Sequence, residues 1–191
     1  MVNAIIMASG FSKRMGANKL LLEYKGIPII DHILREISKV EFNQVVVVSQ
    51  YKEILDLGKK YGFIAVYNGN AHVGQSESIK LGILNSSKCD GYMFFVGDQP
   101  LIDNMQIKKI LYLFEQNKDC IVIPMSNGKK GNPVVFPFHK KEELLMLKND
   151  EKGKKVINTS KKIKYIDVSE NMLFDVDTQD DFNKLLSQIN K

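Results

Sequence analysis

The stretch from Val2 to Lys19, VNAIIMASGFSKRMGANK, decides the fold. It begins with a near-continuous apolar run, Val2–Met7, which is typical of a strand buried on both faces of a parallel sheet. The rest of the stretch, residues 8–19, is a loop rich in small, glycine and basic residues. Ligands of open α/β sheets bind outside the carboxyl ends of the strands, so this loop is the first candidate for a binding site.

The rest of the chain alternates between strand-like and helix-like patterns. Further strands are predicted over residues 44–49, 63–67, 92–96, 120–123, 134–138 and 163–168. Apolar residues at helical spacing predict helices over residues 28–37, 51–61, 76–84 and 103–115, and a last helix that opens at Thr178. Such alternation indicates βαβ units with right-handed crossovers. We therefore predict an α/β fold with three α/β/α layers and a Rossmann-like, mostly parallel sheet.

Individual residues mark several predicted helix starts. Pro28 suits the first turn of a helix, and Asp103 suits an N-cap. Asp180 and Asp181 follow Thr178 in a first turn, where the helix dipole favours negative charge.

Polar features follow directly after three of the predicted strands. They are the loop after Met7, the Gly97-Asp98 turn and the loop after Ile123. Because ligands bind at the carboxyl ends of the strands, we expect these features to form one site. By composition, residues 126–132 (SNGKKGN) form a flexible loop, and it and the charged segment 149–155 are candidates to border the site.

Length, composition and charge exclude several classes of protein. The 191 residues suit one domain, residues 1–191, and 44% hydrophobic with 26% charged residues is ordinary globular composition. The 2 cysteines and 3 histidines are scattered, with no CxxC pair, which argues against a zinc or iron–sulfur site.

No signal peptide or membrane-length apolar run is present, so we expect a cytoplasmic protein with no membrane partner. The net charge of +5 suits polyphosphate substrates, and no aromatic residues interleave with a basic cluster, so we expect no nucleic-acid partner.

The loop after the first strand has the chemistry of an anion site. Gly10 and Gly16 allow backbone conformations that present successive N–H groups to an anion. Arg14 can grip phosphate oxygens bidentately, while Lys19 acts as a compact point charge. The small residues at positions 8–9 leave room for a base or a ribose beside the backbone.

The spacing within this loop separates it from common nucleotide motifs. A P-loop has four residues between its glycines and then Lys-Ser/Thr, whereas five residues separate Gly10 from Gly16 and no such pair follows. The dinucleotide fingerprint GxGxxG is also absent. From spacing alone, an ordinary glycine turn with solvated basic residues stays open.

The loop resembles the signature of the MobA-like NTP transferase family, whose members act on molybdopterin and, more distantly, on sugar phosphates. The family pattern runs small-small-Gly-x-Ser-x-Arg-Met-Gly-x-x-Lys, which residues 8–19 match. Family-like motifs follow in order along nearly the whole chain, at residues 19–22 (KLLL), 26–32 (GIPIIDH), 74–78 (GQSES), 97–101 (GDQPL), 131–134 (GNPV) and 175–178 (DVDT). The resemblance implies a fold of the nucleotide-diphospho-sugar transferase type.

Carboxylates near the strand ends are candidate metal ligands. Asp98 follows the predicted strand 92–96, where a carboxylate could also merely cap a turn. Magnesium usually takes one or two carboxylates plus phosphate oxygens and water, and the resemblance implies that Asp98 supplies one. Residues 175–181 (DVDTQDD) lack the glycine and glutamate of a calcium loop, and their plain interpretation is a helix cap at Thr178. The resemblance implies that Asp177 approaches the Mg²⁺ as well.

The resemblance also implies roles for the remaining site residues. The catalytic residues would be Arg14, Lys19 and Asp98, with Asp98 and Asp177 as the metal ligands. The nucleotide-binding residues would be Ala8, Ser9, Gly10, Ser12, Arg14, Lys19, Gln75, Ser76 and Ser78. The acceptor-binding residues would be Asn132, Pro133 and Asp175.

Motif details favour the cytidylyl branch of the family. Residues 18–19 (Asn-Lys) and 74–78 (GQSES) look like that branch, whereas the guanylyl branch usually carries Leu-Ala-Gly-Gly and later Gly-Gly-x-Asp-Lys. Two residues depart from the cytidylyl pattern. Ser9 stands where that branch usually has alanine, and Asn132 stands where it usually has histidine.

The resulting hypothesis is a molybdenum cofactor cytidylyltransferase-like enzyme. It would transfer CMP from CTP to molybdopterin or the molybdenum cofactor, with Mg²⁺ as cofactor and pyrophosphate as the second product. Its partners would be CTP, a phosphorylated pterin acceptor and, further on, a molybdenum hydroxylase apoenzyme. The alternatives are guanylyl or sugar-phosphate transfer, or a non-catalytic chaperone that binds the molybdenum cofactor. A carrier need not keep a triphosphate–metal site, so Arg14, Lys19 and Asp98 together favour an enzyme.

Overall fold

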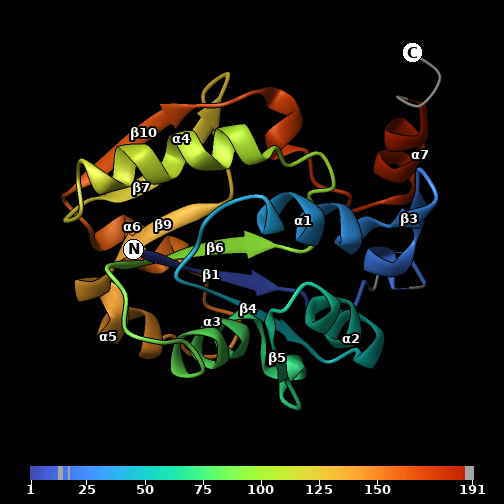
Figure 1. Ribbon diagram of the computed structural model, residues 1–191, viewed down its shortest axis with the longest axis horizontal. Coiled ribbons are helices and arrows are strands. Elements are labelled where there is room, and N and C mark those ends of the chain that lie inside the picture. The colour runs from blue at the N-terminus through green and yellow to red at the C-terminus, as the bar shows by residue number, and fades with distance from the viewer. Residues whose placement is uncertain (13–14, 17, 188–191) are drawn as a thin grey trace.

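The computed structural model describes residues 1–12, 15, 16 and 18–187. Within them, an eight-stranded sheet crosses the molecule (Figure 1). Its strands are ordered β10 (Ile163–Asp167), β7 (Ile121–Ser126), β9 (Val134–Pro137), β6 (Gly91–Val96), β1 (Val2–Met7), β4 (Gln44–Ser49) and β5 (Ile64–Tyr67), with β8 (Lys129–Lys130) paired to β7. β9 runs antiparallel to β6 and β7, whereas β1, β4, β5 and β6 are parallel to one another, as are β7 and β10. The prediction of a mostly parallel sheet is confirmed.

Helices cover both faces of this sheet. Apolar residues of α1 (Ile29–Ser38), α2 (Lys52–Lys60) and α4 (Asn104–Glu115) form one buried cluster with one face. Apolar residues of α3 (Gln75–Leu84), α5 (Lys141–Leu145) and α6 (Lys154–Thr159) form a second cluster with the other face. The predicted three-layer α/β/α architecture is therefore confirmed.

The central strand β1 shows why its sequence is apolar without alternation. Ala4 and Ile6 belong to the cluster under α1, α2 and α4, while Ile5 belongs to the cluster under α3, and all three are fully buried. Burial of an isoleucine side chain stabilises a fold by about 1.5–3 kcal/mol. Gly82 lets α3 approach β1 closely, because a Cβ at this position would lie 2.3 Å from Ile5 Cγ2.

Caps fix the ends of two predicted helices. The Asp103 carboxylate accepts hydrogen bonds from the backbone N–H groups of Met105 (2.6 Å) and Gln106 (3.3 Å), which confirms the predicted N-cap of α4. α7 (Gln179–Ser187) follows Thr178, whose hydroxyl donates to the Asp181 carboxylate (2.7 Å) and accepts from the Asp181 backbone N–H (3.2 Å). The Thr178 backbone N–H also donates to the Asp181 carboxylate (3.0 Å), so the two residues cap each other reciprocally, as in a capping box.

Two local predictions need correction, and one hairpin was not predicted. Pro28 does not lie in the first helical turn: it ends β3 (Ile27–Pro28) and precedes α1. β3 pairs with β2 (Glu23–Tyr24) in a small hairpin, which was not predicted because Pro28 was assigned to the helix over residues 28–37. α7 lies beside this hairpin (Figure 1). The segment 126–132 contains a hairpin between β7 and β8, with Asn127 (φ 50°) and Gly128 (φ 78°) at its turn. Asn-Gly is a strong hairpin signal, because a tight turn of this type needs two positive φ angles.

None of the helices in the described ranges has the length and apolar character that crossing a membrane requires.

Candidate active site

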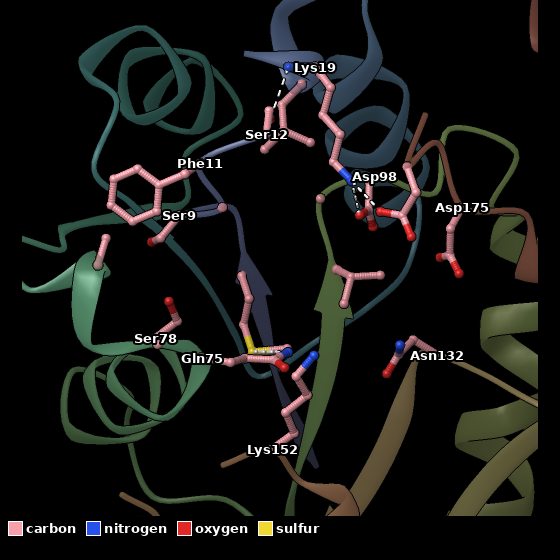
Figure 2. Close-up of a pocket in the computed structure, with 18 of the residues that line it drawn as sticks. Ser9, Phe11, Ser12, Lys19, Gln75, Ser78, Asp98, Asn132, Lys152 and Asp175 are labelled. Atoms are coloured by element: carbon pink, nitrogen blue, oxygen red, sulfur yellow. Dashed lines mark hydrogen bonds and ion pairs between the residues drawn. The ribbon is translucent and has the colours of Figure 1, made fainter. Parts of the chain in front are cut away.

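A cavity of about 610 Å³ lies at the carboxyl ends of β1 and β6 (Figure 2). The three expected features meet there: the loop after β1 contributes Ser9, Gly10 and Ser12, the turn after β6 contributes Asp98, and the segment before β9 contributes Asn132. The parallel pairing of β1 with β6 brings the first two together.

Lys19 joins two carboxylates at one end of this cavity. Its Nζ lies 2.7 Å from Asp98 Oδ2 and 2.8 Å from Asp177 Oδ1, and its side chain is only 12% exposed (Figure 2). Burial by itself would lower the pKa of the Lys19 ammonium, but the charges and hydrogen bonds of the two carboxylates outweigh burial and raise it. Lys19 is therefore held as a cation between two anions.

The backbone around Lys19 is held by its neighbours. Lys19 opens the short 3₁₀ helix η1 (Lys19–Leu21), and the Asn18 side chain accepts from the Leu20 backbone N–H (3.2 Å). The Lys19 backbone N–H donates to Ser12 Oγ (3.1 Å) across the loop. Ser12 thus links the glycine-rich loop to the segment that carries the lysine.

A C-terminal segment brings Asp175 to the cavity together with Asp177. The Val176 backbone N–H donates to the carbonyl of Asp98 (2.9 Å), which fixes Asp175 and Asp177 beside it. Partial burial and the charge of Asp98 raise the pKa of Asp175 to about 6, while a hydrogen bond from Gln99 opposes that shift. The acidic end of the cavity, formed by Asp98, Asp175 and Asp177, therefore combines a residue of the turn after β6 with residues from beyond β10.

A buried amide connects the loop after β1 to α3. Asn68 is fully buried, and its Nδ2 donates to Ser9 Oγ and Ser78 Oγ, both at 3.2 Å. Gln50 Nε2 donates to the Ser9 carbonyl (2.8 Å), which anchors the loop from the other side. Sequence reasoning missed Asn68, although it directly follows β5 at the same edge of the sheet. The strand-end rule that selected Asp98 would have found it.

A second loop reaches the cavity from beyond α5. Asp150 Oδ1 accepts from the Gln75 backbone N–H at the start of α3 (3.3 Å), and Ser76 Oγ donates to the Asn149 carbonyl (2.6 Å). At Gly74 a Cβ would lie 2.6 Å from Asp150 Cα, so only glycine lets the loop approach this closely. The same loop places Lys152 at the cavity. Sequence reasoning expected this segment near the site but did not single out either charged residue.

The structure brings most of the predicted site residues to the cavity. Its lining includes Ser9, Gly10, Ser12, Lys19, Gln75, Ser78, Asp98, Asn132, Asp175 and Asp177. Ala8, Ser76 and Pro133 are not among its lining residues. Ala8 is buried, and the Ser76 hydroxyl donates to the Asn149 carbonyl, so the nucleotide contacts expected of these two residues stay predictions. Arg14 lies outside the described residues.

The acidic end suits a divalent cation that shares its coordination sphere with a phosphate. Among the described residues, no group of three or more His, Cys, Asp or Glu side chains is arranged to hold a metal by itself. Asp98 and Asp177 nonetheless both reach the same Lys19 Nζ, so their oxygens face one point. Two carboxylates completed by phosphate and water are a normal donor set for Mg²⁺.

The fold is that of nucleotidyltransferases of the nucleotide-diphospho-sugar transferase type. The sequence matches the model of the MobA-like NTP transferase domain over residues 4–164. The chain belongs to this family.

Known proteins of this class are similar over most of the chain. A "probable molybdenum cofactor guanylyltransferase" of Natranaerobius thermophilus is 30% identical over 178 residues, which cover 89% of this chain and 82% of that protein. A 3-deoxy-manno-octulosonate cytidylyltransferase of a Nitratiruptor species is 27% identical over 129 residues, 66% of this chain and 53% of that protein. The crystal structure of the molybdopterin-guanine dinucleotide biosynthesis protein A of Archaeoglobus fulgidus superposes with a TM-score of 0.75 at 17% identity, covering 100% of this chain and 99% of that one.

Proposed function

We propose that this protein transfers a nucleoside monophosphate from a nucleoside triphosphate to a phosphorylated pterin of the molybdopterin type. The observation that carries the proposal is the contact of Lys19 with both Asp98 and Asp177, in a cavity beneath a glycine-rich loop. The relative named as a probable molybdenum cofactor guanylyltransferase supports this acceptor.

The proposed reaction needs no covalent enzyme intermediate. An oxygen of the acceptor phosphate attacks the α-phosphorus of the triphosphate, and the bond from that phosphorus to the bridging oxygen breaks as pyrophosphate leaves. The nucleophile is already anionic, so positioning and charge neutralisation provide most of the catalysis. Lys19 supplies a positive charge to the triphosphate, and the backbone N–H groups of the loop around Gly10 bind its oxygens.

We propose Asp98 and Asp177 as the ligands of a Mg²⁺ ion. When bound, this ion neutralises phosphate charge and orients the triphosphate. Asp177 lies beyond residue 164, where the family match ends, so the C-terminal segment completes the proposed site. We therefore propose that residues 1–191 act as one nucleotidyltransferase domain.

We propose CTP as the preferred triphosphate. The supporting features are the Asn-Lys pair at residues 18–19 and the segment 74–78, whose Gln75 and Ser78 line the cavity. The similarity to a cytidylyltransferase is in line with CTP, whereas the relative from Natranaerobius is named a guanylyltransferase. The test incubates the protein with Mg²⁺, molybdopterin and each of the four ribonucleoside triphosphates, and measures pyrophosphate. Faster release with GTP than with CTP would overturn the choice of base.

The acceptor and the enzymatic class are tested in the same assay. Turnover with a sugar phosphate but not with molybdopterin would favour sugar-phosphate transfer. Tight pterin binding without pyrophosphate release from any triphosphate would indicate a carrier. Calorimetric titration with CTP and Mg²⁺ distinguishes a sugar-phosphate transferase from a carrier. A carrier has no need of a triphosphate site, so it should not bind CTP.

Removal of the Asp98 carboxylate tests the proposed site. We expect Asp98→Ala to lower turnover at least about 10²-fold, because a charged contact to the transition state is typically worth about 2–4 kcal/mol. The thermal unfolding midpoint should change little. Asp180→Ala is the matched control, because Asp180 is exposed and lies outside the cavity lining. Near-normal turnover in Asp98→Ala would contradict the assignment.

A further inference from the structure

A second cavity opens beside the first. It has a volume of about 350 Å³ and lies between α3, α5 and α6 and the sheet strands β6, β7 and β9. Four residues line both cavities: Met7, Gln75, Asn132 and Lys152. Figure 2 shows Gln75, Lys152 and Asn132 on the side of the first cavity opposite Lys19. A ligand that spans this junction would reach both spaces.

The inner wall of the second cavity is apolar and partly aromatic. Phe94 and Phe136 meet edge to face, with ring centroids 5.7 Å apart, and both are at least 97% buried as whole residues. The other apolar lining residues are Ile79, Ile123, Val134, Leu144 and Ile157. Such a wall suits the faces of a flat ring system, whose polar groups lie at its edge, whereas a polyhydroxylated sugar carries hydroxyl groups on its faces that would lack partners against the wall.

The rim of the same cavity is cationic. Lys130, Lys152 and Lys154 contribute to the lining. Within the described ranges, neither Lys152 nor Lys154 forms an ion pair with a carboxylate, whereas Lys130 Nζ lies 2.9 Å from the Tyr165 hydroxyl. The charge of Lys152 is therefore available to an anion at the junction of the two cavities.

The position of Lys152 is fixed by anchors on its loop. On the side before it, Asn149 and Asp150 are bonded to the start of α3 through Ser76 and Gln75. Glu151 accepts from the Lys148 backbone N–H (2.9 Å), which closes the turn. After it, Gly153 packs on the ring of Phe136, where a Cβ would lie 3.0 Å from Cζ. The loop therefore holds the lysine over the junction.

We propose that Lys152 binds the phosphate of the acceptor at this junction, and that the second cavity holds the acceptor's planar ring. The acceptor class is thus a phosphomonoester of a flat heterocycle rather than a sugar phosphate. This inference rests on the proposed function, which it deepens by locating the acceptor. It also gives Lys152 a positioning role, because it brings the attacking phosphate to the face of the first cavity opposite Lys19.

A fluorescence titration of the full chain tests the binding site without turnover. The probes are 6-hydroxymethylpterin monophosphate, its dephosphorylated form and ribose 5-phosphate, the last followed by competition. We expect the pterin phosphate to bind at least about tenfold more tightly than either of the others, since both the ring and the phosphate contribute. Equal or tighter binding of ribose 5-phosphate would overturn the acceptor class.

Variants separate the two parts of the site. Lys152→Ala should weaken binding of the pterin phosphate about tenfold and leave binding of the dephosphorylated pterin unchanged. Lys148→Ala is the matched control, an exposed lysine of the same loop that lines neither cavity. Asn158→Trp places a large ring at an exposed lining position and should block both pterins while CTP binding persists. An unchanged affinity in both Lys152→Ala and Asn158→Trp would overturn the proposal.

Kinetics distinguish this inference from the proposed function. In Lys152→Ala we expect a higher KM for the pterin acceptor and an unchanged KM for CTP. Turnover with an acceptor KM equal to that of the unchanged protein would overturn the role of Lys152 while the proposed function stands. If the unchanged protein binds the pterin in a Lys152-dependent way but shows no turnover, the role of Lys152 stands and the proposed function is contradicted.

Discussion

Lys19 links two carboxylates of the acidic end, and its charge has two consequences. In the absence of nucleotide it neutralises Asp98 and Asp177, which otherwise would repel each other across a partly buried site. In the proposed reaction its charge faces the triphosphate. The structure gives this ammonium group a structural role, the proposed function adds a catalytic one, and a neutral replacement separates the two.

We predict that Lys19→Met lowers kcat/KM for the triphosphate about 10²–10³-fold, because the charge that faces the phosphates is lost. In the absence of nucleotide the same variant should bind Mn²⁺ or Mg²⁺ more tightly, since the carboxylates lose their competing cation. Calorimetry measures the second effect independently of turnover. Lys88→Met, at an exposed lysine away from the cavity, is the control. Metal affinity that falls in Lys19→Met would contradict this account of the carboxylates.

Single residues also show where sequence reasoning reached its limit. Lys19, Asp98 and Asp177 were predictable, because each belongs to a motif of recognisable spacing. Asn68 and Lys152 were not predicted, for different reasons. Asn68 follows β5 directly, so the strand-end rule applies to it, although its contacts with Ser9 and Ser78 form only once β5 and α3 are docked. The placement of Lys152 depends on contacts between distant segments, which no local pattern encodes.

At the scale of elements, α3 joins the site to the core. Its first turn carries Gln75 and Ser78 at the first cavity, and its later turns bury Ile79 and Ile83 against the sheet. The close approach at Gly82 sets the distance between α3 and β1.

We predict that Gly82→Ala destabilises the fold by about 1–3 kcal/mol, because the added methyl group would overlap Ile5. This cost should exceed the gain of about 1 kcal/mol in helix propensity that alanine offers over glycine. Urea unfolding with an unchanged m-value measures the effect. Leu84→Ala, at a position of the same helix that is 66% exposed, should change stability by no more than about 0.5 kcal/mol. A neutral or stabilising Gly82→Ala would show that helix and strand can move apart at no cost.

The order and type of the elements were predictable from the sequence, and the short ones were not. Buried strands are recognisable as continuous apolar runs and amphipathic helices by apolar residues at helical spacing, which is why β1, β4, β6 and the main helices were predicted. β2, β3 and β8 are two residues long each, so periodicity has no length over which to act. α5 and α6 have 5 and 6 residues, and their stability comes from packing Leu144 and Val156 on the sheet rather than from local propensity.

At the scale of the whole molecule, the buried phenol of Tyr92 makes the free energy of unfolding depend on pH. Burial, with Cys89 nearby, raises the pKa of Tyr92 well above its ordinary value. Tyrosine in an unfolded chain ionises near about pH 10. Above that pH the unfolded state gives up a proton that the folded state keeps, so the stability contributed by the neutral phenol is lost as pH rises.

We therefore predict that the Tm falls between about pH 9 and pH 11, and falls less steeply in Tyr92→Phe. Phenylalanine keeps the ring that packs near Phe94 and Phe138 and removes only the ionising hydroxyl. Tyr112→Phe, at a tyrosine that is 71% exposed, should follow the unchanged protein. Parallel curves for all three proteins would rule out Tyr92 as the source of the alkaline transition.

The hydrogen bond from the Val176 N–H to the Asp98 carbonyl has a consequence for synthesis on the ribosome. Translation adds Asp177 after every strand of the sheet, of which β10 at residues 163–167 is the last. A polypeptide whose synthesis stops directly after β10 therefore has every strand of the described sheet but lacks Asp175 and Asp177 of the acidic end. Formation of the sheet and completion of the acidic end depend on different segments of the chain.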